Sequence, residues 1–512
     1  MVKKLLISIL VLLAIGVAAT GFARAQGTER TLRGIPSGWS VTANGQSVTV
    51  NNDGSYTIES GAAVKLISPT EVKPTVQTVT VFNPLAIPLT MKALTAGTIK
   101  VDNPKSGMKY SKNGVDTTVM TSTTEITVAA GDKVAFFGDG TAIASYVGTK
   151  ISGGTANVKV YGNIMSLLNE TGYDTATTLT GTSTFMYLFL NNAKLTDASG
   201  LLLPATTLAN DCYAYMFLNC SNLTAAPALP ATTLAERCYF SMFQGCTDLT
   251  AAPALPATTL VYSCYNSMFQ GCTGLTTAPE LNATTMAGNC YHGMFRDCTG
   301  LTAAPALPAT TLAGFCYYGM FQGCTGLTTA PALPATTLAG NCYNGMFQGC
   351  TGLTAAPVLP AETLAVHCYN QMFLGCTSLT TAPALPATTL ADHCYYYMFQ
   401  GCTSLTIAPV LPATKLVLFC YSYMFQGCTG LTAAPVLPAT TLATQCYNNM
   451  FQGCSNLSSV TCLATSGINQ NESTTNWLNG VATSGTFTKA ANANWEEGTS
   501  GIPSGWNVVN AQ

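Results

Sequence analysis

Cysteine has the most regular spacing of any reactive residue type in this sequence. Twenty of the 21 cysteines stand in ten pairs with seven residues between the two members, and Cys462 stands alone. Zinc sites use closer pairs, with roughly two to four residues between ligands, so this spacing does not favour a metal. Two residues eight apart on a helix lie about 12 Å apart, beyond the roughly 4.4–6.8 Å that a disulfide spans.

Disulfides between neighbouring units remain possible in an exported protein. Every unit, however, offers the same partner on both sides, so no neighbour is preferred. We therefore expect free, buried thiols that act as small apolar side chains.

The three histidines are the other residues that could do chemistry. His367 and His393 occupy the same position in adjacent units, beside Asp392, and His292 lies in a variable position of an earlier unit. Two histidines and one aspartate on a solvated stripe would make a weak metal site. We find no nucleophile–base pair and no glycine-rich phosphate loop, so we expect no cofactor, no metal and no enzymatic activity.

Charge excludes several classes of partner. Only 8% of the 512 residues are charged, the formal net charge is -2, and lysine and arginine form no runs. Nucleic acids and anionic membranes both need clustered basic residues, so neither is an expected partner. Hydrophobic residues reach 48%, which is too high for a disordered chain.

From Leu195 the sequence repeats itself, and from Leu223 to Leu431 the units follow one another every 26 residues without insertion or deletion. The unit reads L-T-x-A-P-x-L-P-A-T-T-L-x-x-x-C-Y-x-x-M-F-x-G-C-x-x, with its first cysteine recurring from Cys212 to Cys446 and its second from Cys220 to Cys454. A fixed period of this length predicts one coil per unit, which buries its apolar face only against its neighbours.

Each unit is expected to hold one short helix and one short strand. The first Cys, Met and the second Cys stand at i, i+4 and i+8, which predicts the apolar stripe of a helix. The residue before the second Cys is Gly except at Asn219 and Asp297, which predicts a left-handed C-terminal cap. Leu-Thr-x-Ala is the expected strand, ended by the proline that follows it. At about 4.8 Å per coil, the array would be roughly 50–60 Å long.

The predicted fold is therefore an α/β repeat solenoid of leucine-rich-repeat type, preceded by an all-β N-terminal region. Stretches around Phe189 and Trp477 echo the unit without its cysteines and are the expected caps. Alternating apolar runs between the hairpin pairs Asn44-Gly45 and Asn113-Gly114 predict the β region. The expected segments are a signal peptide (1–25), a small β module (26–75), a β-sandwich-like domain (76–168), the N-terminal cap (169–194), the array (195–456), and the C-terminal cap and tail (457–512).

The first 25 residues have the pattern of a secretory signal peptide. Lys3 and Lys4 precede an apolar run, and Ala23-Arg24-Ala25 supplies the small residues of a cleavage site. An uncleaved membrane anchor is the alternative. We expect a secreted or cell-surface protein with no membrane insertion after cleavage, because no second long apolar stretch follows.

The positions that vary between units carry the strongest functional signal. They are the two residues before the first Cys and the two after the Tyr that follows it, 40 positions between Asn210 and Asn449. Four are charged, and nine are aromatic where the chain average of 9% predicts three or four. On the expected helix these residues share an outward face, a composition typical of recognition surfaces, although some could merely cover the seam between helices. The nine aromatic candidates are Tyr215, Phe240, Tyr262, Phe315, Tyr318, Tyr396, Tyr397, Phe419 and Tyr423.

The repeated block M-F-x-G-C-x-x-L-T, followed by a proline-bearing strand, resembles the BspA-like leucine-rich-repeat surface proteins of bacteria. The junction Tyr161-Gly162-Asn163-Ile164-Met165-Ser166-Leu167-Leu168 and the Gly-Ile-Pro-Ser-Gly-Trp tail are also similar to that group. The resemblance covers residues 160–512 well and the β region more loosely. It implies a surface or secreted protein that adheres to matrix proteins or cells. The proline in every strand and the second Cys of each unit prevent a residue-by-residue transfer of contacts.

Three functions remain open from the sequence. The first is an adhesin-like module that holds an extracellular protein or glycan through the aromatic stripe or the Thr-lined strand face. The second is a spacer or coat protein that binds nothing. The third is an ice-binding surface, suggested by columns of threonine such as Thr224, Thr250 and Thr276, although proline in every strand disfavours the flat array that this needs.

Overall fold

The structure is a computed structural model of the whole chain, and it describes residues 83–139, 148–151 and 154–512. Before residue 83 it describes residues 7–8, 22–26, 29–32, 35, 40–51, 55–59, 63–67 and 77–80. Most of the predicted signal peptide therefore lies outside the described residues. The chain divides into two compact units, Met1–Ile87 and Pro88–Gln512.

The first unit holds two small antiparallel sheets around Val41, Ile58 and Val64. Asn44 and Gly45 both have positive φ, at 50° and 82°, and join two paired strands as the sequence predicts. One sheet has the order β1-β2-β3-β6, with β1 Ile7–Ser8, β2 Phe22–Gln26, β3 Glu29–Leu32 and β6 Tyr56–Glu59. The other has the order β5-β4-β7-β8, with β4 Ser40–Ala43, β5 Gln46–Val48, β7 Ala63–Ile67 and β8 Gln77–Thr80.

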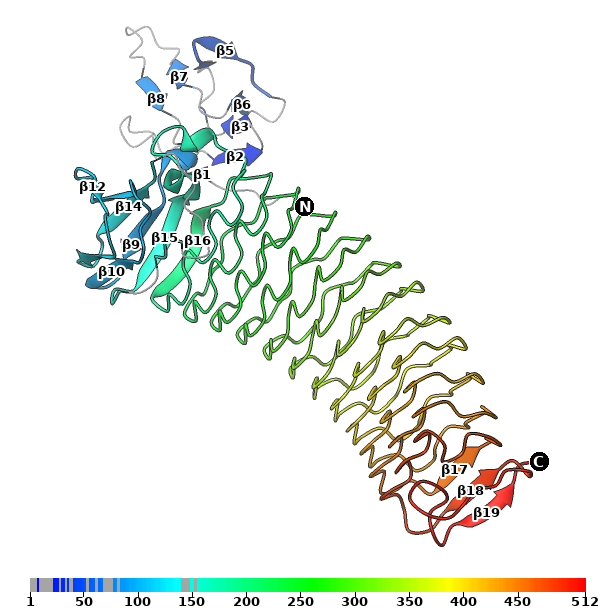
Figure 1. Cartoon of the computed structure of the whole chain (residues 1–512). Coiled ribbons are helices and arrows are strands. Elements are labelled where there is room, and N and C mark those ends of the chain that lie inside the picture. Colours follow the sequence, from blue (N-terminus) through cyan, green and yellow to red (C-terminus); the bar gives the residue numbers. More distant parts are fainter. Residues whose placement is uncertain are drawn as a thin grey trace. The chain divides into compact units, whose positions relative to one another are not determined.

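The second unit begins with two β-sheets and continues into the array (Figure 1). The last strand of the larger sheet, β16, pairs in parallel with β15 and is the first strand of the array. One continuous core runs from Leu89 to Trp506, so the sheets and the array are a single packed body. The larger sheet has the order β12-β11-β14-β9-β15-β16, with β9 Thr90–Ala93, β11 Lys109–Lys112, β12 Thr118–Val119, β14 Lys133–Phe137, β15 Val158–Asn163 and β16 Leu195–Leu202; the smaller pairs β10 Gly97–Val101 with β13 Thr124–Val128.

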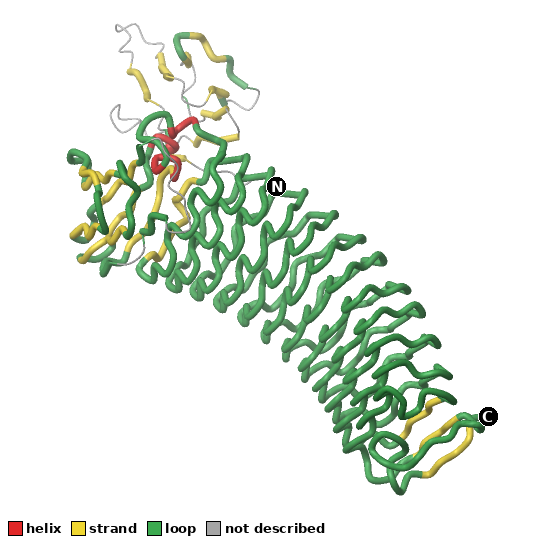
Figure 2. Tube along the Cα trace, viewed as in Figure 1, coloured by secondary structure: helices red, strands yellow, loops and turns green. Residues whose placement is uncertain are grey.

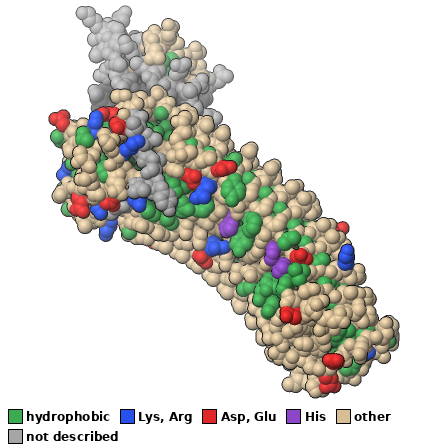
Figure 3. All heavy atoms as spheres, viewed as in Figure 1, with side chains coloured by type: hydrophobic (Ala, Val, Ile, Leu, Met, Phe, Trp, Pro, Cys, Tyr) green, Lys and Arg blue, Asp and Glu red, His purple; other side chains and the backbone are tan. Residues whose placement is uncertain are grey.

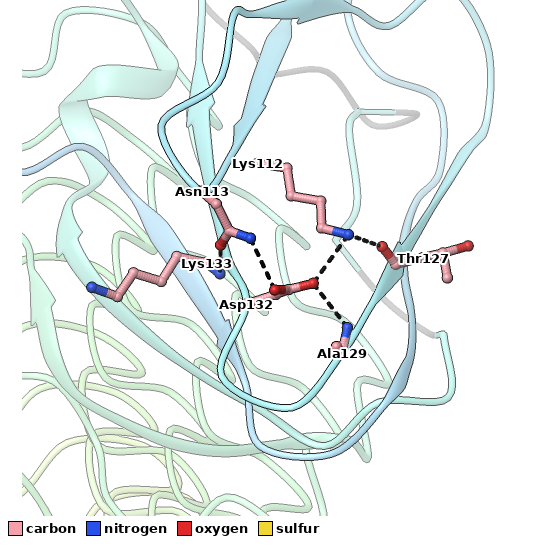
Figure 4. A network of polar contacts seen from close by, with 6 residues as sticks. All are labelled: Lys112, Asn113, Thr127, Ala129, Asp132 and Lys133. Carbon is pink, nitrogen blue, oxygen red and sulfur yellow. Dashed lines mark hydrogen bonds and ion pairs between the residues drawn. The ribbon is translucent and has the colours of Figure 1, made fainter.

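A polar network joins two hairpin turns of this β region (Figure 4). The Asp132 carboxylate accepts from Asn113 Nδ2 at 2.9 Å and forms an ion pair with Lys112 Nζ at 3.0 Å. The pKa of Asp132 falls to about 2, mainly because of the Asn113 hydrogen bond, followed by those of the Ala129 N–H and Lys112. The network explains why Asn113-Gly114 forms a turn at that place.

The segment between the two cysteines of each unit is a run of turns, and the expected α-helix is wrong (Figure 2). Within the described residues, the helical segments are three short 3-10 turns, η1 Pro84–Ala86, η2 Ile164–Leu167 and η3 Tyr173–Thr175. None of the three lies in the array. Where described, no helix is long and apolar enough to cross a membrane.

Left-handed residues at every fourth position are the physical reason that no helix forms. In the first coil, Asp211, Tyr215 and Asn219 have φ of 54°, 57° and 59°, and the same three positions recur along the array. A right-handed helix of L-residues cannot continue through such positions. The left-handed residue before the second Cys was predicted correctly from its glycine, but as the cap of a helix.

The turns direct alternate N–H groups into the next coil. The N–H of Tyr215 donates to the carbonyl of Phe240 in the next coil at 2.8 Å. The N–H of Met216 instead donates to the carbonyl of Tyr213, three residues back, at 3.3 Å. An α-helix would keep all of these bonds within one coil, whereas the turns use half of them to join coils.

The expected strand is reduced to one bridging residue per coil. Ala303, Thr329 and Ala355 form a parallel column of bridges at the x of Leu-Thr-x-Ala. A second column, which the sequence did not predict, joins Thr285 and Thr311 in the Ala-Thr-Thr-Leu stretch. Longer pairing stops because proline, which has no N–H to donate, follows two residues after the first bridge.

Aromatic columns fill the core between the coils. The Tyr after each first Cys stacks on its counterpart in the next coil, from Tyr213 to Tyr447, with ring centroids 5.7–6.1 Å apart. A second column of Phe runs beside it. The two predicted caps lie at the ends of these columns. Phe189 of the N-terminal cap stacks on Phe217 of the Phe column, and Trp477 of the C-terminal cap stacks on Tyr447 of the Tyr column.

The C-terminal cap closes the array with a parallel sheet of β17 Ser459–Cys462, β18 Thr486–Lys489 and β19 Asn507–Asn510. Two of the three cap indoles donate hydrogen bonds, Trp477 Nε1 to the Gly501 carbonyl at 2.9 Å and Trp506 Nε1 to that of Ala482 at 2.8 Å, whereas the buried Nε1 of Trp495 has no hydrogen-bond partner. The tail sequence around Trp506 is therefore part of the cap.

We predict that Gly401→Ala lowers the free energy of unfolding by about 1–2 kcal/mol. Gly401 has φ of 70°, and an added Cβ would lie 3.9 Å from the nearest atom, so the cost comes from the backbone and not from a clash. Denaturant unfolding followed by circular dichroism measures it. Gly401→Asn should lower the free energy of unfolding by less, because asparagine tolerates this conformation. The control Thr403→Ala changes an exposed residue and should leave the free energy of unfolding nearly unchanged. Equal stability of the alanine variant and the parent would contradict the assignment.

Candidate functional site

The second cysteine of each unit is a structural hydrogen-bond donor. Cys246 Sγ lies 3.2 Å from the carbonyl oxygen of Phe217 in the preceding coil. The same contact recurs at about 3.0 Å along the column, for example from Cys350 to Phe321. The thiol therefore supplies a donor to a buried carbonyl and fills the space between two coils.

All 21 cysteines are free and buried, as the sequence predicts. Burial raises the pKa of thiols such as Cys272 and Cys350 to about 12. The thiolate is the nucleophile and the metal ligand, so these groups are chemically inert near neutral pH.

The three histidines contribute rings to aromatic stacks. His367 and His393 stack with ring centroids 4.4 Å apart, and His393 stacks on Phe419 at 4.6 Å. Burial lowers the pKa of both histidines; His367 lowers that of His393 further, and Asp392 partly opposes both shifts. Over the part of the chain that is described, no group of three or more His, Cys, Asp or Glu residues could hold a metal.

The nine aromatic candidates form local groups and not one continuous stripe. Tyr215 lies against Phe240 at 5.2 Å and stacks on Tyr187 of the N-terminal cap at 4.8 Å. Phe315 lies 5.9 Å from Tyr318, which stacks on His292 at 4.7 Å. The sequence reasoning did not include Tyr187, and it considered the histidines as metal ligands and not as members of ring stacks, because these contacts join different coils. Tyr262 is 50% exposed and is one of the candidates outside these groups.

Six rings from three adjacent coils make the largest group, which we call the aromatic cluster: His367, His393, Tyr396, Tyr397, Phe419 and Tyr423. Its rings form two stacked columns, one of His367, His393 and Phe419 and one of Tyr397 and Tyr423, whose centroids lie 4.4 Å apart. All six side chains are partly exposed. On the face in Figure 3, histidines border hydrophobic patches and charged side chains are sparse.

Tyr396 lies across the two columns. Its ring plane is inclined by 81° to that of Tyr397, by 89° to that of Phe419 and by 76° to that of Tyr423, with centroids 4.3–5.8 Å apart. Edge-to-face contacts of this kind are favourable, at about 0.5–1.5 kcal/mol per pair beyond burial. Tyr396 therefore holds the two columns together.

Five of the six cluster residues have a left-handed backbone. His367, His393, Tyr397, Phe419 and Tyr423 have φ between 53° and 57°. Bulky residues rarely adopt this conformation, and other coils place Gly345 or Asn341 at the same positions. Each such residue costs roughly 1–2 kcal/mol compared with glycine. The period-four recurrence of Gly, Asn and Ser was the signal that could have revealed these positions.

The strand side of the array is a second surface with few charges. Val358, Ile407 and Val410 are each at least 74% exposed there. An open groove of about 410 Å³ lies between the prolines of two adjacent coils, from Ala330–Pro334 and from Pro357, Val358 and Pro360. The rows of threonine are exposed on the same side, together with a few charged residues such as Glu280 and Lys415, so this face also offers apolar contact.

Residues 369–475 match the family described as BspA type leucine rich repeat region, in six copies. The resemblance expected from the repeated motif is confirmed there, and the matched range includes most of the aromatic cluster. The match supports a leucine-rich-repeat array, while the structure replaces its expected helix by turns. No curated protein and no solved structure matches the chain.

We predict that the native protein resists alkylation. A rise in thiol pKa from about 9 to about 12 lowers the thiolate fraction near pH 8 roughly a thousandfold. Iodoacetamide at pH 8 should modify fewer than one cysteine per chain in the native state, and all 21 in guanidinium chloride, as measured by intact mass. Stoichiometric modification of the folded protein would show that the thiols are accessible.

Stability should fall steeply at alkaline pH. The folded thiols keep their protons up to about pH 12, whereas unfolded cysteine loses its proton near pH 8.5. The unfolded state therefore binds fewer protons above pH 8.5, and the stabilisation present below that pH is lost progressively as the pH rises toward 12. The melting temperature should change little between pH 7 and 8 and drop clearly by pH 10.5. An unchanged value at pH 10.5 would argue against buried, protonated thiols.

Proposed function

We propose that this chain, which carries a BspA-type leucine-rich-repeat region, is an exported or cell-surface protein that binds an extracellular protein or glycan through the aromatic cluster. The proposal includes secretion by the predicted signal peptide and no catalytic activity. It includes no nucleic-acid partner and no insertion into the membrane after cleavage. Surface association fits the family that the array matches.

One observation carries the proposal: five bulky rings occupy backbone positions that favour glycine. The same positions are left-handed in every coil and hold residues such as Asp211, Arg237 and Gln445 elsewhere, so what distinguishes the cluster is that large rings fill them in three adjacent coils. Stacking returns about 0.5–1.5 kcal/mol per ring pair, which roughly offsets the strain without improving on glycine. These rings also stay partly exposed, and this combination of strain and exposure supports a role in binding.

The composition of the surface also supports recognition. Tyrosine supplies a large contact area with few rotatable bonds, and aromatic residues are enriched in the centres of interfaces. A partly exposed group of six rings is much more than the scattered apolar residues of an ordinary surface.

A non-binding spacer or coat protein is the rival proposal. The coil that contains Gly340, Asn341, Asn344 and Gly345 has no aromatic residue at the four variable positions, and it still stacks like its neighbours. Stacking thus needs none of the variable aromatics. If the cluster binds nothing, the array serves as a spacer.

We expect the purified mature chain to bind at least one member of a panel of extracellular-matrix proteins and glycans. A variant with Tyr396, Tyr397, Phe419 and Tyr423 changed to Ser should lose that binding at least tenfold, as measured by surface plasmon resonance. Circular dichroism and melting should show that the variant is folded. Equal binding by both proteins would move the site to the strand side or the β region, and no binding by either would favour the spacer.

The single variant Tyr397→Asn separates binding from stability. Asparagine relaxes the left-handed backbone while the ring contacts are lost, so the free energy of unfolding should change by less than about 1 kcal/mol. The affinity for the ligand, by contrast, should fall at least severalfold. A large loss of stability would mean that the ring is there for packing.

A further inference from the structure

The cluster is uncharged to slightly acidic, which limits the ligands that it can hold. Between Val366 and Asn449 the charged residues are Asp392 and Lys415. Asp392 and Glu472 influence the pKa of cluster members, whereas no lysine or arginine does so. Burial lowers the pKa of His367 and of His393, which favours the neutral form of both rings. Anionic ligands, such as sialylated or sulfated glycans and acidic peptides, would find no cation to pair with.

The backbone of the cluster is already fully paired. The N–H groups of His393 and Tyr397 donate to Leu418 and Ser422 in the next coil, at 3.0 and 3.1 Å. The carbonyls of His393 and Tyr397 accept from Tyr396 and Gln400, at 3.3 and 3.2 Å. An extended peptide binds a fold by adding a strand to free main-chain groups, and the cluster offers it none. Recognition must therefore use rings and side-chain polar groups.

Tyr396 is the ring of the cluster that stacks on no other ring. The rings of the two columns stack on one another, which occupies their facing sides. The four ring neighbours of Tyr396 all meet it at a steep angle, between 66° and 89°. The face of an aromatic ring carries negative potential and attracts weakly positive C–H groups. One side of a pyranose ring presents such C–H groups and no charge.

Neutral polar groups surround this ring. Tyr397 carries a hydroxyl whose pKa is raised to about 12, first by burial and then by its hydrogen bond with Tyr396. Gln371 of the preceding coil, whose N–H donates to the Tyr396 carbonyl at 2.8 Å, adds an amide group. Asn370 is buried, and its Nδ2 contacts His367 Nδ1 at 2.9 Å. Hydroxyl and amide groups can both donate to and accept from the hydroxyls of a sugar.

From this geometry we infer that the ligand of the aromatic cluster is a neutral oligosaccharide, with one pyranose ring stacked on Tyr396 and its hydroxyls bonded to the surrounding tyrosine and amide groups. The inference rests on the proposed function and narrows it to one ligand class. A protein ligand is the competing outcome of the test.

The test is binding of the full mature chain to an array of neutral oligosaccharides and their sialylated or sulfated counterparts, with affinities then measured by calorimetry. We expect a neutral glycan to bind at least tenfold more tightly than its sialylated form. Tyr396→Ala should lose at least tenfold in affinity, whereas Tyr396→Phe keeps the ring and should lose less than about threefold. The matched control Tyr262→Ala removes an exposed tyrosine outside the cluster and should bind like the parent.

Tighter binding of the sialylated form, or parental affinity in Tyr396→Ala, would overturn the inference. If a matrix protein binds and the four-residue serine variant loses it, but no neutral glycan binds, the proposed function stands and the glycan inference falls. If neither a protein nor a glycan binds, both fall.

Discussion

The array depends on a left-handed residue at every fourth position of the segment between the two cysteines. Positive φ at positions such as Asp211, Tyr215 and Asn219 ends each turn and points alternate N–H groups at the next coil. Because those bonds fix neighbouring coils in register, the Tyr, Phe and Cys columns stack on their own counterparts. The same register aligns the exposed positions, so a ring in one coil meets a ring in the next. Core and surface thus share one backbone constraint.

The sequence predicted the period, the caps and the burial of the cysteines, because these follow from side-chain type. It did not reveal the turns, because Cys, Met and Cys at four-residue spacing also fit one face of a helix of 3.6 residues per turn. The second signal was the recurrence of Gly, Asn and Ser at that spacing, as at Gly293, Gly319 and Gly345. Only the glycine before the second Cys was interpreted as left-handed. The proline in each unit did predict a short strand. It did not predict that the strand would be reduced to a single bridging residue.

The sequence predicted several residues of the candidate site but not how they are arranged. Counting aromatic residues at variable positions identified Tyr396, Tyr397, Phe419 and Tyr423, and the structure brings these four together. The histidines were weighed as metal ligands, whereas they extend the ring columns. Spacing within a unit predicts neighbours along one coil, and these contacts join residues about 26 apart. Residues that far apart in the sequence can be identified as neighbours only when the register between coils is known.

The strain of the cluster is distributed in a way that the rest of the fold can sustain. Each left-handed ring costs roughly 1–2 kcal/mol, yet each lies between buried columns of Tyr, Phe and Cys that are the same in every coil. An identical core lets one coil change its surface residues without altering its neighbours, because a repeat contacts only the coils on either side. The variable positions are therefore free to differ from coil to coil, and a run of adjacent aromatic coils builds a site wider than any single unit. The uniform core therefore supplies the stability that allows strained residues at the surface.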